Sequence, residues 1–164
     1  MTDLNAAYPI YLASSWRNRY YPSVLHALRL AGQQVYDFRE AGAAFDWRDV
    51  DAEWENKPGT RMEYPLSRML EMLNHPSAQR GYERDFAALD ACEALILVAP
   101  CGRSAHLELG YAIGKGKPTA IYIPEPHEPE LMYLMAERRI GTLFELLAWA
   151  DALAITTHSE VSNQ

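Results

Sequence analysis

Cysteine is scarce in this chain of 164 residues, which contains only Cys92 and Cys101. These two residues form no Cys-x-x-Cys pair and suggest no disulfide framework. Basic residues are also few, because 15 Lys and Arg stand against 22 Asp and Glu, for a formal net charge of -7. So acidic a chain is poorly suited to a nucleic-acid backbone or an anionic bilayer. We therefore expect neither a nucleic acid polymer nor a membrane as its main partner.

Long apolar runs and a leader segment are missing as well. The longest apolar runs are strand-sized, too short for a transmembrane helix. The N-terminal residues MTDLNAAYP contain no basic segment followed by an apolar one, so we expect no signal peptide. With 49% hydrophobic residues, the length predicts a single domain over residues 1–164 with a sizeable core. A soluble, cytoplasmic protein is expected.

Three familiar catalytic or cofactor motifs are absent. The glycines before Lys117 lack the Gly-Lys-Ser/Thr ending of a phosphate loop, and they follow a predicted helix where a phosphate loop would precede one. His106-x-Glu108 is not followed by the Pro-Cys-x-x-Cys of zinc deaminases. No Gly-x-Ser-x-Gly elbow supports an acyl-transfer hydrolase. We expect neither a metal nor another cofactor.

The most informative stretch present is residues 92–123, whose pattern predicts strand, loop, helix and strand. Residues 94–99 form an unbroken apolar run, typical of a strand buried on both faces in a parallel sheet. Ser104 is the expected N-cap of a helix that ends near Gly114, and residues 119–123 form the next strand. The loop and helix start of such a unit lie at the carboxyl ends of the strands, where open α/β sheets bind ligands.

The flanking residues extend this unit into an α/β fold. Strands at 10–13 and 34–38 enclose a polar loop at 14–19 and a helix that ends at Gly32, which is the start of a doubly wound sheet. The other expected elements are helices at 60–73, 77–92, 131–137 and 142–150, a last strand at 152–156 and a frayed tail at about 158–164. We expect a mostly parallel sheet of about five strands.

An irregular insert occupies about residues 39–59. It carries Phe45, Trp47 and Trp54 among several acidic residues. This composition favours either a lid or subunit contact, or a satellite hydrophobic cluster under a long loop.

Glu108 is the strongest candidate for chemistry. It follows Ser104 by four residues, so both lie on one face near the helix N-terminus, where the helix dipole favours an ionised carboxylate. Most glutamates are solvated, but Glu108 lies in an otherwise apolar segment. Beside a ligand crevice it is a candidate nucleophile or base. Asp85 and Tyr11 are further candidates. The alternative interpretations are an ordinary surface charge for Asp85 and a core side chain for Tyr11.

Four segments together resemble the nucleoside 2-deoxyribosyltransferase-like family, a flavodoxin-like branch of the Rossmann-like three-layer α/β folds. They are IYLASSW at 10–16, RDFAALDACEALILV with Asp85, RSAHLELGYA with Glu108, and GKP at 116–118. The Glu-Leu-Gly-x-Ala core is the most specific piece, and the likeness covers roughly residues 8 to 123. The chain departs from the family at Ser14 or Ser15, where a glycine is usual, and at Arg103 and His106, which replace smaller residues.

The resemblance implies cleavage or transfer of the N-glycosidic bond of a nucleoside or nucleoside 5′-monophosphate. Breaking that bond builds positive charge on the sugar, which a carboxylate stabilises and can bond covalently, the role implied for Glu108. Asp85 would protonate the leaving base, and Tyr11 would orient Glu108. Transfer to another base and hydrolysis by water both stay open.

The residues expected to bind substrate can hydrogen-bond a sugar or 5′-phosphate, stack on a base, or line the ligand site. They are Ser14, Ser15, Arg17, Ser104, His106, Trp16 and Trp47. The implied partners are a small-molecule nucleoside or nucleotide and further copies of the chain in a homo-oligomer. The alternative functions are a non-catalytic module that senses a nucleotide or NAD, and a purely structural subunit.

Overall fold

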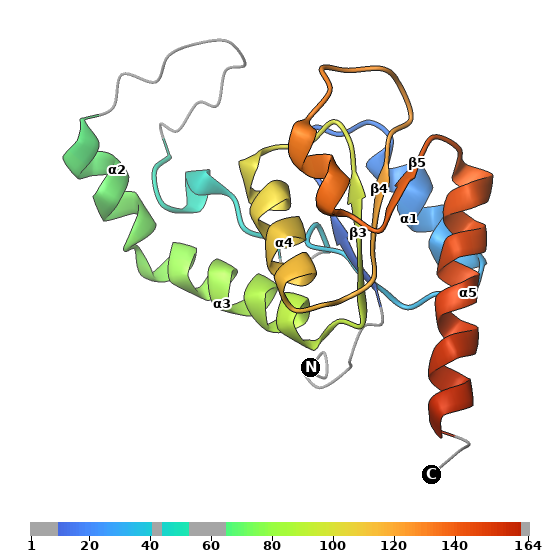
Figure 1. The fold of residues 1–164 in the computed structure, drawn as a ribbon. Helices are drawn as coiled ribbons and strands as arrows, with labels where there is room; N and C mark the ends of the chain where they lie inside the picture. Colours follow the sequence, from blue (N-terminus) through green and yellow to red (C-terminus); the bar gives the residue numbers. More distant parts are fainter. Residues whose placement is uncertain (1–9, 41–43, 53–64, 162–164) are drawn as a thin grey trace. The chain divides into compact units, whose positions relative to one another are not determined.

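The computed structural model describes residues 10–40, 44–52 and 65–161 (Figure 1). The chain divides into two compact units, of which one comprises residues 1–37 and 88–164 and the other residues 38–87. The first unit contains the whole sheet. None of the helices in these described ranges combines the length and the apolar composition needed to cross a membrane.

The first unit is built on five parallel strands. They are β1 (Ile10–Ala13), β2 (Val35–Tyr36), β3 (Ala94–Val98), β4 (Thr119–Tyr122) and β5 (Arg138–Ile140), in the spatial order β2-β1-β3-β4-β5. Strand β1 therefore has β2 on one side and β3 on the other, so the chain reverses its direction of winding between these strands. Such a switch point opens a crevice at the carboxyl ends of the strands. The predicted parallel α/β sheet of about five strands is confirmed.

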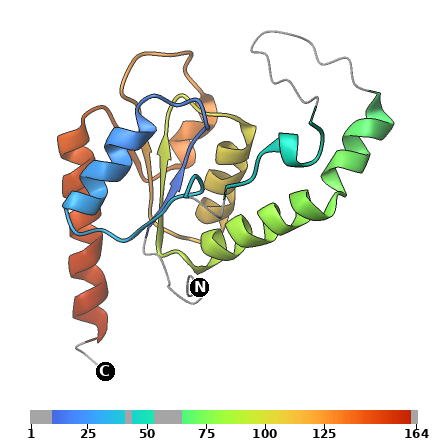
Figure 2. The same ribbon diagram turned by 180° about the vertical axis from the view of Figure 1, so that it is seen from behind.

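Helices cover both faces of this sheet, which makes three layers. Helices α1 (Tyr21–Leu30) and α5 (Leu143–Val161) lie together on one face, whereas α4 (Arg103–Gly114) packs over β1, β3 and β4 on the other (Figure 2). The interior is strongly apolar: all five residues of β3 are buried. Burial of an aliphatic side chain contributes about 1.5–3 kcal/mol, so β3 is a major source of the stability of this unit.

The C-terminal predictions were wrong in two places. Residues 131–137 do not form one helix, because the 3-10 helix η2 (Leu131–Met135) ends at Met135 and β5 begins three residues later, at Arg138. Residues 152–156 belong to α5 and not to a last strand. Thr142 caps α5, since its hydroxyl accepts a hydrogen bond from the N–H of Glu145 at 3.2 Å, and no Gly or Pro interrupts the helix before Val161. Residues 158–161 of the predicted frayed tail are therefore helical, and 162–164 lie outside the described residues.

Helix α3 (Pro76–Ala91) also begins one residue earlier than expected. Ser77 does not cap it; the N–H of Ser77 donates to Nδ1 of His75 at 3.2 Å, so the histidine ring takes the capping role. Pro76 fits the first turn of a helix because that turn needs no N–H from it.

The second unit contains most of α3, the helix α2 (Leu66–Leu73) and the 3-10 helix η1 (Trp47–Asp49). Phe45 packs on Gly81 of α3 so closely that an added Cβ would lie 3.0 Å from the Phe45 side chain. The Phe45 ring meets Trp47 edge-on, with ring centroids 5.0 Å apart. This part of the insert is thus an aromatic cluster on α3. Trp54 and residues 60–64 of the predicted helix lie outside the described residues.

Candidate active site

Tyr11 and Glu108 are joined by a hydrogen bond. The Tyr11 hydroxyl donates to Oε1 of Glu108 across 3.1 Å. Tyr11 is buried in β1, and its ring stacks on Tyr36 of β2 with centroids 5.2 Å apart. Because two strands hold the ring, the hydroxyl presents a fixed donor to the carboxylate.

The position of Glu108 follows from the apolar pattern of α4. Ala105, Leu109 and Ala112 are buried and face the sheet. Glu108 lies at the edge of this face, and its side chain is half-buried. The helix begins at Arg103 with Gly102 as its N-cap, in an extended conformation (φ −87°, ψ −175°) and without a side-chain cap. The prediction of Ser104 as the N-cap was wrong, since Ser104 already lies in the first turn, where its side chain is exposed.

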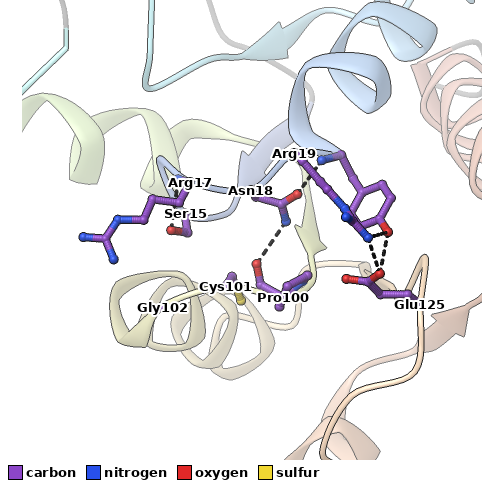
Figure 3. Close-up of a pocket in the computed structure, with 9 residues that line it drawn as sticks. Ser15, Arg17, Asn18, Arg19, Pro100, Cys101, Gly102 and Glu125 are labelled. Carbon is purple, nitrogen blue, oxygen red and sulfur yellow. Dashed lines mark hydrogen bonds and ion pairs between the residues drawn. The ribbon is translucent and has the colours of Figure 1, made fainter. Parts of the chain in front are cut away.

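A pocket of about 470 Å³ opens at the carboxyl ends of the strands in this unit (Figure 3). Its walls are the loop after β1, the loop after β3 and the loop after β4. The lining residues are Ser15, Arg17, Asn18, Arg19, Tyr20, Pro100, Cys101, Gly102 and Glu125. The volume is in the range of pockets that enclose small-molecule ligands.

Cys101 connects Glu108 with this pocket. Burial raises the pKa of the Cys101 thiol to about 12, and the negative charge of Glu108 adds to the rise. The carboxylate is thus close enough to the sulfur of a pocket residue to disfavour its ionisation. At neutral pH Cys101 remains a thiol, which makes it a poor nucleophile. Neither Glu108 nor Tyr11 is among the residues that line the pocket.

Asn18 joins two walls of the pocket and was missed by the sequence analysis. Its Nδ2 donates to the carbonyl oxygens of Val98 at 2.9 Å and Pro100 at 3.0 Å. Its Oδ1 accepts from the N–H groups of Tyr20 at 2.7 Å and Tyr21 at 3.2 Å. The side chain, 6% exposed, therefore uses both donors and both acceptor sites. The one available signal was an asparagine in a polar loop before a helix, a common capping position.

Ser14 and His106 have internal partners. The Ser14 hydroxyl donates to the Val98 carbonyl at 2.9 Å, which braces the first loop. Nδ1 of His106 lies 2.8 Å from the carbonyl oxygen of Gly102, so Nδ1 carries the proton, because a carbonyl only accepts. Nε2 is then the acceptor for the Tyr133 hydroxyl at 3.2 Å. His106 ties the start of α4 to η2.

Arg19, Tyr20 and Glu125 close the opposite end of the pocket. Oε2 of Glu125 accepts hydrogen bonds from Nη2 of Arg19 at 2.5 Å and from the Tyr20 hydroxyl at 2.6 Å. The same Arg19 nitrogen donates to the Tyr20 hydroxyl at 2.6 Å, and the guanidinium lies over the Tyr20 ring, 4.8 Å from its centroid. The Tyr20 hydroxyl and Arg19 hold the pKa of Glu125 below its usual range. We call these three residues the clasp.

The remaining predicted site residues fall into two groups. Ser15 and Arg17 line the pocket, whereas Trp16 is 52% exposed in the same loop. Asp85 and Trp47 belong to the second unit. There, Arg84 donates to Oδ1 of Asp85 from Nε at 3.0 Å and from Nη2 at 2.8 Å. The functional roles of Asp85 and Trp47 stay predictions.

The described part of the chain contains no cluster of three or more His, Cys, Asp and Glu side chains arranged to hold a metal ion. A carboxylate held by a tyrosine hydroxyl is suited to nucleophilic attack or to proton abstraction.

Comparisons with known proteins place this geometry on a familiar fold. No protein-family model matches the chain, and no curated protein matches it. Among solved structures, the chain is similar to a 2-deoxyribosyltransferase from the psychrotolerant bacterium Bacillus psychrosaccharolyticus, with a TM-score of 0.53 and 16% identity. The similarity covers 84% of this chain and 89% of that one. The chain thus shares the three-layer α/β fold of the nucleoside deoxyribosyltransferases.

Proposed function

We propose that this protein breaks the N-glycosidic bond of a nucleoside or nucleoside 5′-monophosphate, with Glu108 as the nucleophile. The observation that carries the proposal is the 3.1 Å hydrogen bond from Tyr11 to Glu108 in the unit that also forms the pocket. The fold shared with a 2-deoxyribosyltransferase supports the same reaction class.

The proposed reaction has two steps. In the first, a carboxylate oxygen of Glu108 bonds to the anomeric carbon of the sugar, while the electron pair of the N-glycosidic bond leaves with the base. The departing base takes a proton, and we assign its delivery to Asp85 on the basis of the sequence resemblance. In the second step, water or another base attacks the same carbon and frees Glu108. The product is a free sugar or a new nucleoside.

Tyr11 has a positioning role in this scheme. Its hydrogen bond holds one oxygen of Glu108, leaves the other oxygen to attack the sugar, and favours the ionised carboxylate. Ser15 and Arg17 line the pocket and are suited to bind sugar hydroxyl or phosphate oxygens. Ser104 adds a hydroxyl on the exposed first turn of α4.

The test compares Glu108→Gln and Glu108→Ala with the wild type. The proteins are incubated with a panel of nucleosides, their 5′-monophosphates and NAD, and free base is quantified by chromatography. The matched control is Glu93→Gln, since Glu93 is exposed just before the first residue of β3, at the amino end of the strand. We expect base release by wild type and control, and none by the Glu108 variants with unchanged melting temperatures.

Turnover by a Glu108 variant would refute the nucleophile assignment. Ligand-induced rises in melting temperature without any free base would favour the alternative, a module that senses a nucleotide or NAD. No rise for any ligand would favour a purely structural subunit.

Self-association is a further part of the proposal. The 3-10 helix η2 exposes four large apolar side chains, with Leu131 73%, Met132 58%, Leu134 70% and Met135 51% exposed. Contiguous apolar side chains of this kind are typical of protein contacts. Light scattering coupled to size-exclusion chromatography measures the mass, and a monomer would refute a homo-oligomer.

A further inference from the structure

The clasp contains two of the charged side chains that line the pocket. Arg17, Arg19 and Glu125 are the charged residues among the lining side chains. Two cations and one anion leave the lining with a formal charge of +1. A positively charged lining attracts a phosphate group, and the attraction depends on how many of the positive charges are neutralised.

The contacts of Arg19 show how Glu125 acts on that charge. Arg19 donates to the Glu125 carboxylate, donates to the Tyr20 hydroxyl and lies over the Tyr20 ring. These partners hold the guanidinium against the loop after β4. The negative charge of Glu125 also raises the pKa of Arg19, after the larger effect of the Tyr20 hydroxyl. The charge of Arg19 is therefore paired before any ligand arrives.

We propose that Glu125 is a specificity-determining residue which restrains the preference of the pocket for phosphate-bearing ligands. The inference depends on the proposed function for the class of ligand, a nucleoside or its 5′-monophosphate. With Glu125 in place, a phosphate has to compete with a carboxylate for Arg19, whereas an uncharged sugar hydroxyl does not. Loss of the carboxylate frees Arg19 for the phosphate and strengthens the binding of the monophosphate alone.

The clasp is accessible to solvent, which sets the size of the effect. The Arg19 side chain is 71% exposed and that of Glu125 is 38% exposed. Exposed ion pairs are weak and screened by salt. We expect changes in ligand preference of about three- to five-fold, large enough for titration calorimetry and smaller at high ionic strength.

The test uses a charge series in which only the clasp varies. Glu125→Gln raises the lining charge to +2, Arg19→Gln lowers it to zero, and the double variant restores +1. All proteins carry Glu108→Ala, so that bound ligand is not consumed. The measured quantity is the ratio of the dissociation constants of deoxyguanosine and deoxyguanosine 5′-monophosphate. The control is Glu128→Gln, which removes an exposed charge from the same loop without touching the clasp.

Opposite changes in the two single variants are the expected result. Relative to the parent, Glu125→Gln should bind the monophosphate more tightly than the nucleoside, which raises the ratio of nucleoside to monophosphate dissociation constants. Arg19→Gln should lower this ratio. The double variant and Glu128→Gln should keep a ratio near that of the parent. A loss of monophosphate binding in Glu125→Gln would show that Glu125 only holds the loop, and would overturn the inference. Equal ratios in all proteins, or no binding of either ligand, would do so as well.

The outcome is separate from that of the proposed function, because binding and not base release is measured. A pocket whose preference follows the charge series in a protein that never releases base would support the inference and refute the enzyme. Base release by the wild type, combined with the same ratio of dissociation constants in all variants, would support the enzyme and refute the inference about Glu125.

Discussion

The hydroxyl of Tyr11 lies 3.1 Å from Oε1 of Glu108, although β1 and α4 are far apart in the chain. Tyr11→Phe removes this donor and keeps the ring stacked on Tyr36. We expect kcat/KM to fall about 10- to 100-fold, because one charge-assisted hydrogen bond contributes about 1.5–3 kcal/mol. Steady-state kinetics on the nucleoside that the wild type uses provides the measurement.

The pH profile gives the Tyr11 prediction a second readout. The hydrogen bond favours the ionised form of Glu108, so its loss raises the pKa of the carboxyl group. The acidic limb of the kcat/KM profile should therefore move to higher pH in Tyr11→Phe. A variant with wild-type kinetics and an unmoved limb would contradict the positioning role.

Asn18→Asp tests the junction between the two loops of the pocket. A carboxylate in place of Nδ2 would face the carbonyl oxygens of Val98 and Pro100, which are both acceptors. We expect a loss of about 2–4 kcal/mol in the free energy of unfolding, since the oxygen that replaces Nδ2 would carry negative charge against two carbonyl oxygens and find no donor there. Chemical denaturation measures this loss. Ser23→Ala, which removes an exposed hydroxyl from the start of α1, is the control and should change stability by less than about 1 kcal/mol.

Alkylation of Cys101 reports on the charge of Glu108. With a pKa of about 12, the thiol is almost fully protonated at pH 8, so iodoacetamide should modify it slowly. Glu108→Gln removes the second cause of the raised pKa, so the modification should become faster. Peptide mass spectrometry separates Cys101 from Cys92, which is buried. An unchanged rate in Glu108→Gln would place the carboxylate too far from the sulfur to influence it.

The same raised pKa predicts a loss of stability in alkali. The pKa of the unfolded thiol lies near 9.0, whereas burial raises the pKa of the folded thiol to about 12. Between these values the unfolded state binds fewer protons, so the contribution of Cys101 to stability is complete below pH 9 and is lost as pH rises toward 12. Cys101→Ser should flatten this part of the curve of unfolding free energy against pH.

Lys117 is expected to stabilise the end of α3. Its Nζ donates to the carbonyl oxygens of Leu89 at 2.8 Å, Asp90 at 2.7 Å and Cys92 at 2.6 Å. A cation there satisfies carbonyls at the helix C-terminus and opposes the negative end of the dipole. Lys117→Met should lower the free energy of unfolding by about 2–3 kcal/mol without a change in KM. Lys115→Met, which removes a neighbouring exposed cation, is the control and should cost less than about 1 kcal/mol.

The central part of the fold could be predicted because its residues are chemically uniform. The run at 94–98 is apolar on both faces, and only a buried strand satisfies such a pattern. The pattern of residues around Glu108 likewise predicted a helix that ends near Gly114, which is where α4 ends. Local patterns of this kind indicate which residues are buried, and this information was enough to predict the central strand and helix.

In the C-terminal third, local sequence patterns did not predict the elements correctly. Arg138 and Arg139 are exposed at the edge of the sheet, so β5 has no apolar run that would reveal it. The predicted strand at 152–156 has the composition of a strand, but no turn residue separates it from the helix that begins at Leu143. The number of strands was confirmed, whereas the position of the last one was wrong.

The contacts between the walls of the pocket could not be predicted from local sequence patterns. Asn18 binds carbonyls that follow 80 and 82 residues later, and Arg19 pairs with Glu125 at a separation of 106. The hydrogen bond from Ser14 to the carbonyl oxygen of Val98 also joins distant segments, and the role of Ser14 in substrate binding stays a prediction. Only the folded chain brings such pairs together, because neither member is unusual in its own segment.

The place of β1 in the sheet has a consequence for folding during synthesis. Ile10 pairs with Val35 on one side and with Ala94 on the other. Strand β1 is thus an interior strand of the sheet, and its edge toward β3 stays unpaired during synthesis until Ala94 and the residues after it have been translated. Contacts between such distant segments form slowly. We expect nascent chains that stop short of β3 to be the ones that need a chaperone.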